Sequence, residues 1–259
     1  MRYRNLSYIA LGAVALGAIF SVNPAWAGEG GMPDLSLSIG GSELASDGGV
    51  TSMLKIVGLM TALTFAPAMV LTMTCFTRVA IVLSMTRTAL GTMQMPPNMV
   101  LTGLAMFLTI AIMNPVFTQM YNDGIKPYME GTMAQDEALT KVSAPLKKFL
   151  IRHAREKDLA LFLDITKSKA PDSPEDIPFH VAVPAFVMSE LNVAFQIGFL
   201  IALPFLVLDM VVSSVLTSLS MITLPPVVIS LPLKLMLFVI VDGWHLIIGS
   251  LVQTYHVDG

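Results

Sequence analysis

The residues of chemical interest are charged side chains that stand inside apolar segments. Lys234 and Asp242 lie in the run Met221–Trp244, which has the length of a membrane helix and also contains three prolines. A charge in the bilayer interior costs roughly 2.5 to 3.5 kcal/mol on insertion scales, and each proline removes a backbone donor. Such a segment is stable only where protein or water surrounds it. We therefore expect other protein or a pore beside this run.

Lys234 and Asp242 do not neutralise each other on one straight helix. Their spacing of eight residues corresponds to about 12 Å along a helix axis, and the two side chains point in different directions. Further charges in or beside apolar segments are the candidate partners, namely Glu190, Asp209, Arg78 and Arg87. We predict structural ion pairs, within or between copies of the chain, that involve Glu190, Asp209, Lys234 and Asp242. For Arg78 and Arg87 we favour anchoring at the cytoplasmic side of the first apolar hairpin.

Motifs of catalysis and metal binding are missing from the sequence. It contains no HExxH, GxSxG, CxxC or Walker motif, and its four histidines share no ligand spacing. Asp209 and Asp242 raise the alternative of an intramembrane aspartyl protease, but their flanks, LDMV and VDGW, add no further sign of one. We predict that the chain is not an enzyme and uses no cofactor or metal.

Composition places the chain in the membrane class. Of its 259 residues, 54% are hydrophobic and 13% are charged, and the mean hydropathy is +0.73. Soluble domains carry about 25% charged residues. The net charge of −3 argues against a nucleic-acid partner.

The N-terminus has the pattern of a secretory signal peptide over residues 1–27. Arg2 and Arg4 precede an apolar stretch, and Ala25 and Ala27 frame an A-x-A cleavage site. The alternative is a first helix that is not cleaved. Residues 28–51 are rich in Gly, Ser and Asp, which predicts a flexible arm.

The remainder predicts an all-α, membrane-associated fold of two long, kinked helical hairpins, over residues 52–120 and 181–259. Pro67 and Pro115 are expected to bend the first hairpin, and Pro204 to break or kink the second. Residues 121–180 hold nine basic and ten acidic residues on amphipathic patterns. They predict a small helical periplasmic domain with a linker. Pro96-Pro97 and Pro225-Pro226 indicate either a faint internal repeat or two independent hairpins.

Three blocks of sequence resemble the FliP/SctR family of type III secretion export-gate proteins. They are FTRVAIVLSMTRTALGTMQMPP from Phe76, PAFVMSELNVAFQIGF from Pro184 and PPVVISLPLKLMLFVIVDGW from Pro225, in that order. The resemblance runs from about Leu54 to Tyr255. The signal peptide favours the flagellar branch over the injectisome branch.

This resemblance implies a pore-forming core subunit that passes unfolded flagellar subunits across the bacterial inner membrane. It implies a ring of five copies in the flagellar basal body, in contact with membrane lipid, with FliQ and FliR as partners and FliO as assembly factor. FlhA and FlhB of the export apparatus are further implied partners. The open alternatives are an injectisome gate subunit and a secondary transporter for a small solute, since broken helices and buried charges also suit a transporter.

The resemblance also implies a pore loop or gasket before the Pro-Pro pair. In the family this loop is methionine-rich, whereas here only Met221 is a methionine. Apolar side chains can still close a pore by excluding water. The alternative is a simple helix-breaking turn. The residues concerned are Met221, Ile222, Thr223, Leu224, Pro225 and Pro226.

Overall fold

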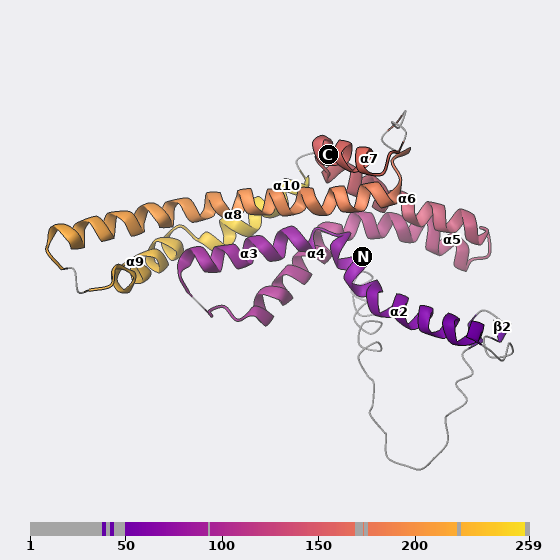
Figure 1. Cartoon of the computed structure of the whole chain (residues 1–259), viewed down its shortest axis with the longest axis horizontal. Helices are drawn as coiled ribbons and strands as arrows, with labels where there is room; N and C mark the ends of the chain where they lie inside the picture. The colour runs from indigo at the N-terminus through magenta and orange to yellow at the C-terminus, as the bar shows by residue number, and fades with distance from the viewer. Residues whose placement is uncertain are drawn as a thin grey trace, which may run out of the picture. The chain divides into compact units, whose positions relative to one another are not determined.

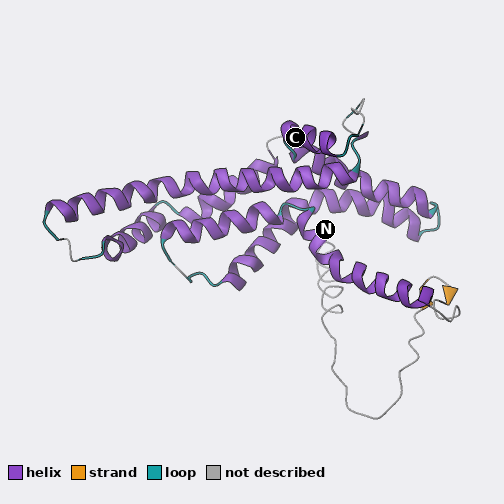
Figure 2. Cartoon of the chain, viewed as in Figure 1, coloured by secondary structure: helices purple, strands orange, loops and turns teal. Residues whose placement is uncertain are grey.

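The computed structural model describes residues 38–39, 42–43, 50–92, 94–168, 173, 176–221 and 224–256. Their regular structure is helical except for two short antiparallel strands, β1 (Ser38–Ile39) and β2 (Ser42–Glu43) (Figure 2). The predicted all-α class is confirmed. The proposed signal peptide with Ala25 and Ala27 lies outside the described residues, and so do Ile222 and Thr223.

The chain divides into two compact units, residues 1–60 and 61–259. Helix α2 (Val50–Thr72) belongs to both. The second unit contains the remaining helices, which are α3 (Phe76–Leu90), α4 (Asn98–Met120), the π-helix η1 (Tyr121–Ile125), α5 (Lys126–Met129), α6 (Gln135–His153), α7 (Glu156–Ile165), α8 (Phe179–Ser218), α9 (Pro226–Ile240) and α10 (Gly243–His256).

The second unit is built along α8, a helix of 40 residues (Figure 1). Helices α3, α6, α7 and α9 all pack against it. Pro204, where we expected a break or a kink, lies inside α8 and does not end the helix, and Pro184 is also inside it. Packing of neighbouring helices can compensate for the hydrogen bond that a proline removes from an apolar helix.

Helix α4 continues through η1 into α5, so that Asn98–Met129 is one helical segment of 32 residues. Gly124 of η1 lies against α6, where an added Cβ would come within 2.9 Å of the backbone nitrogen of Val142. The predicted boundary at residue 120 therefore falls inside a helix.

One core joins the apolar helices to the charged region. Buried side chains from α3, α6, α7 and α8 form a single cluster, for example Leu83, Leu150, Leu159 and Phe186. Residues 121–168 thus do not form a compact unit of their own. The physical reason is that α6 and α7 are amphipathic: α7 packs its apolar face against α8, and α6 packs against α4, η1 and α8.

Two segments are long and apolar enough to cross a membrane, Asn98–Met129 and α8. Two bent pairs pass the same test, Ile56–Thr72 with α3 at 67° and α9 with α10 at 61°. If each bent pair is one span, the described part of the chain has up to four spans. This arrangement agrees with a membrane-associated helical protein.

Candidate structural and pore site

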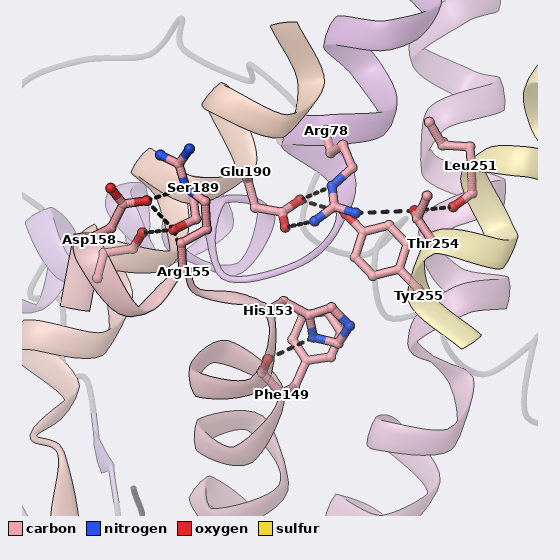
Figure 3. Close-up of polar contacts among 11 residues, drawn as sticks. Arg78, Phe149, His153, Arg155, Asp158, Ser189, Glu190, Leu251, Thr254 and Tyr255 are labelled. Atoms are coloured by element: carbon pink, nitrogen blue, oxygen red, sulfur yellow. Dashed lines mark hydrogen bonds and ion pairs between the residues drawn. The ribbon is translucent and has the colours of Figure 1, made fainter. Parts of the chain in front are cut away.

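Arg78 and Glu190 form an ion pair in the core between α3 and α8 (Figure 3). Arg78 Nε donates to Glu190 Oε2 at 2.9 Å, and Arg78 Nη2 donates to Oε1. The residues are 4% and 0% exposed, respectively. The two parallel contacts match a guanidinium to a carboxylate, which is the strongest geometry for such a pair.

The last turn of α10 completes this cluster. The Tyr255 hydroxyl donates to Glu190 Oε2, and Arg78 Nη1 donates to Thr254 Oγ1 at 3.1 Å. The Arg78 guanidinium also lies 4.1 Å from the centre of the Tyr255 ring. Hydrogen bonds and a cation–π contact thus connect α3, α8 and α10 around one charge pair. From α6, the His153 ring lies 5.1 Å from the Tyr255 ring.

A second polar cluster, centred on Ser189 next to Glu190 in α8, attaches α7 to α8. Ser189 Oγ donates to Asp158 Oδ2 at 2.6 Å, and Arg155 Nε donates to the same oxygen at 2.7 Å. The Arg155 backbone N–H donates to Ser189 Oγ at 2.9 Å (Figure 3). Burial alone would raise the pKa of Asp158, but the Ser189 hydroxyl and the Arg155 guanidinium outweigh it and lower the pKa.

A third contact joins α8 to α9. Lys234 Nζ lies 2.5 Å from Asp209 Oδ2, and Lys234 is 7% exposed. The structure therefore brings Asp209 and Lys234 together, whereas Glu190 is paired with Arg78. Asp242 makes no ion pair with any described residue and is exposed in the turn between α9 and α10.

The two arginines of α3 are placed differently. The sequence favours an interfacial anchor at Arg78, but the structure buries it because α3 packs along α8 and meets Glu190 there. Arg87 is half-buried, and its Nη1 donates to Pro96 O at 3.2 Å and to Asn98 Oδ1 at 2.5 Å. Arg87 thus holds the connection between α3 and α4.

The candidate pore loop begins with a capped helix end. Ser220 has a left-handed φ of 58°, its N–H donates to Thr217 O, and the Met221 N–H donates to Leu216 O, both at 3.0 Å. These are the bonds of a Schellman motif, which ends α8 sharply. Pro225 and Pro226 then start α9. Met221 is 43% exposed.

Sequence reasoning missed Asp158, Ser189, Thr254 and Tyr255. Ser189 does carry a signal, because it directly precedes Glu190 in an otherwise apolar stretch. The other three stand in amphipathic or terminal segments, where polar residues are ordinary. Within the described residues, no group of three or more His, Cys, Asp and Glu side chains could hold a metal ion.

Comparison with known proteins decides the family. The model of the FliP family matches residues 59–251, which include most of both apolar hairpins. The chain belongs to the FliP family. The FliP match contains the buried ion pair Arg78–Glu190, the partly buried ion pair Asp209–Lys234 and the loop before Pro225.

Several curated FliP proteins are similar over most of their length. The flagellar biosynthetic protein FliP of Bacillus subtilis (strain 168) is 52% identical over 206 residues, which cover 80% of this chain and 93% of the relative. FliP of Pectobacterium carotovorum subsp. carotovorum is 44% identical over 243 residues, covering 94% and 92%. FliP of Caulobacter vibrioides is 47% identical over 213 residues, covering 82% and 80%.

Proposed function

We propose that this FliP-family chain is a pore-forming core subunit of the flagellar type III protein export gate. In this role it passes unfolded flagellar subunits across the inner membrane. The observation that carries the proposal is the match to flagellar biosynthetic protein FliP of Bacillus subtilis at 52% identity over 93% of that relative. The helices that are apolar enough to cross a membrane support a membrane role.

In this proposal the chain works as a ring of five copies that assembles with FliQ and FliR. FliO assists the assembly, and FlhA and FlhB act beside the gate. Support comes from large apolar side chains that α8 and α9 leave exposed, for example Phe195, Phe199, Val239 and Ile240, which are 57%, 56%, 73% and 75% exposed. Apolar surface of this extent needs lipid or other subunits to cover it.

The loop between α8 and α9 is the proposed closure of the pore. The capped end of α8 and the two prolines that start α9 give this loop defined ends. Met221 is a flexible apolar side chain, and Leu224 follows it at the far side of the loop. Side chains of this kind, repeated around a ring, would close a narrow pore to water and ions.

The two ion pairs that α8 makes with its neighbours are structural elements of this gate. Arg78–Glu190 holds α3 to α8, and Asp209–Lys234 holds α8 to α9. Each pair fixes one element of a hairpin in register with the long helix. In the proposed topology, residues 121–180 face the periplasm and the hairpin ends at 91–97 and 219–225 face the cytoplasm.

An in-frame deletion of the gene in its own cell tests the function. We expect loss of hook and filament by electron microscopy and loss of flagellar subunits from the medium, both restored by the intact chain. Normal filaments and normal secretion in the deletion strain would contradict the flagellar assignment. A Lys234→Ala variant that assembles and secretes as the wild type does would contradict the role of the α8–α9 ion pair.

A further inference from the structure

Among the residues that the structure describes, the charges of five apolar helices do not all find a counter-charge within the chain. Helices α3, α4, α8, α9 and α10, with the turn at 241–242, carry three basic and three acidic residues. Two ion pairs use four of them, Arg78–Glu190 and Lys234–Asp209. One charge of each sign is left without a counter-charge among the described residues, Arg87 and Asp242.

The Arg87 guanidinium has N–H donors that the described residues do not use. Its Nη1 donates to the oxygens of Pro96 and Asn98, which are both neutral acceptors. Its Nε and Nη2 make no hydrogen bond with the part of the chain that the structure describes. Those two nitrogens form the side of the guanidinium that can bind both oxygens of a carboxylate.

Asp242 sits in an apolar patch. It occupies the turn between α9 and α10 with a left-handed φ of 51° and is exposed. Around it in sequence, Val239, Ile240 and Leu246 are 73%, 75% and 55% exposed. Once another protein covers this patch, the carboxylate loses water, and a cation on the covering surface must compensate for that loss.

Both charges adjoin the same small core cluster. Leu90 of α3, Phe205 of α8 and Phe238 of α9 pack together, with Trp244 of α10 against them. Arg87 lies one helical turn before Leu90. Asp242 directly precedes Gly243, where an added Cβ would clash with the Phe238 ring. Arg87 and Asp242 are therefore at similar positions along the axis of α8, near Phe205. If copies pack side by side in register, Arg87 of one copy and Asp242 of the next would be at similar positions along that axis.

We propose that Arg87 of one copy forms an ion pair with Asp242 of the neighbouring copy. The pair fixes the register between adjacent copies, and each copy supplies one charge to each of two neighbours, as a head-to-tail ring requires. This inference rests on the proposed function, since it needs several copies of the chain in one gate. The partner it names is a second copy, because the two unmatched charges belong to the same chain and are of opposite sign.

Disulfide trapping in the assembled gate tests the contact. Two differently tagged chains are co-expressed, one with Arg87→Cys and the other with Asp242→Cys, and in both the single cysteine is removed by Cys75→Ala. Oxidation is expected to give a dimer that carries both tags. The matched control uses Ser250→Cys in place of Asp242→Cys, because Ser250 is exposed on α10 eight residues further along the chain. The yield of the mixed dimer from this control should be at least about tenfold lower.

Charge exchange tests the energetics of the same contact. Arg87→Glu or Asp242→Arg alone should lower the recovered ring at least about tenfold, since each change brings like charges together. The double exchange on every chain should restore most of it. Single variants that assemble normally would overturn the inference, and so would a double exchange that assembles no better than either single variant.

The trapping experiment also separates this inference from the proposed function. Chains that co-purify but give no mixed dimer would overturn the Arg87–Asp242 contact and leave the multi-copy gate intact. A chain with both cysteines that forms only an internal disulfide would overturn it too, because the two residues would then pair within one copy. Chains that never co-purify would contradict both the contact and the assembly.

Discussion

At the scale of single residues, the chain has charged side chains inside its apolar core, and their counter-charges and hydrogen-bond partners lie beside them. Glu190 is fully buried and takes hydrogen bonds from Arg78 and Tyr255. A buried pair of this kind adds little stability relative to apolar residues, but losing one partner leaves an uncompensated charge. The Arg78–Glu190 pair therefore specifies how α3, α8 and α10 meet more than it strengthens the core.

Replacing Glu190 by Gln should destabilise the fold strongly. Arg78 would remain charged and buried without a carboxylate, at a cost of about 3–5 kcal/mol. Urea unfolding of the detergent-solubilised protein measures the loss. The matched control is Glu130→Gln, which breaks the pair with Lys126 where both side chains are 55% exposed, and should cost less than about 1 kcal/mol. Equal effects of the two variants would contradict the structural role of Glu190.

The lowered pKa of Asp158 leads us to expect that the free energy of unfolding depends on pH in acid. Its pKa is lowered from the ordinary 3.8 in the folded protein, so its contribution is present above that value and is lost as the pH falls through the lower folded pKa. Asp158→Asn should therefore destabilise the attachment of α7 by about 1–3 kcal/mol. The difference from wild type should stay constant from about pH 7 to 5 and shrink only in stronger acid.

Unfolding curves of wild type and Asp158→Asn, recorded across this pH range, measure that difference. The control is Asp164→Asn on the same helix, where the side chain is exposed and little change is expected at any pH. A difference that already shrinks between about pH 7 and 5 would contradict the lowered pKa of Asp158.

At the scale of elements, close contact between α3 and α8 sets the arrangement of the long helix. At Gly198 of α8, an added Cβ would lie 2.9 Å from the Cβ of Met85 on α3. Real side chains almost never approach so closely, and the two helices are in contact along most of α3. The absence of a side chain at Gly198 is therefore a condition for this packing.

Gly198→Ala should force α3 away from α8 and destabilise the protein by about 1–3 kcal/mol, despite the better helix propensity of alanine. The matched control is Gly103→Ala in α4, where nothing lies within 4 Å of the added Cβ. There the substitution should be neutral or stabilising by up to about 1 kcal/mol. Thermal unfolding of both variants gives the comparison, and a neutral Gly198→Ala would show that α3 and α8 can separate freely.

The sequence predicts the helices better than it predicts their contacts. Apolar runs and proline pairs indicate the two hairpins, and charges inside those runs indicate ion pairs. The choice of partner was not predictable for Arg78, because Glu190 is 112 residues away and meets it only through the register of α3 on α8. Similarly, the amphipathic patterns of α6 and α7 indicate helices, but not that α7 packs on α8 and α6 on α4, η1 and α8.

At the scale of the whole molecule, the second unit has a packed helical core and also leaves a large apolar surface exposed. A large core cluster, a smaller one, and the ion pairs Arg78–Glu190 and Asp209–Lys234 hold its helices to α8. The outer faces of α8 and α9 remain largely apolar, and Asp242 has no counter-charge among the described residues. A chain of this kind fits a subunit whose surface is completed by assembly, which agrees with its place in the FliP family.

The most direct test asks whether an export substrate passes the loop between α8 and α9. A photoreactive residue in place of Met221 is combined with a flagellar subunit fused to a domain that cannot unfold, so that the substrate stalls in the gate. A pore role predicts a cross-link between the chain and the stalled substrate. The same substitution at Met129, which is 75% exposed on α5, should give none. Absence of the Met221 cross-link while the substrate is stalled, or equal cross-linking at both positions, would contradict the proposed path through this loop.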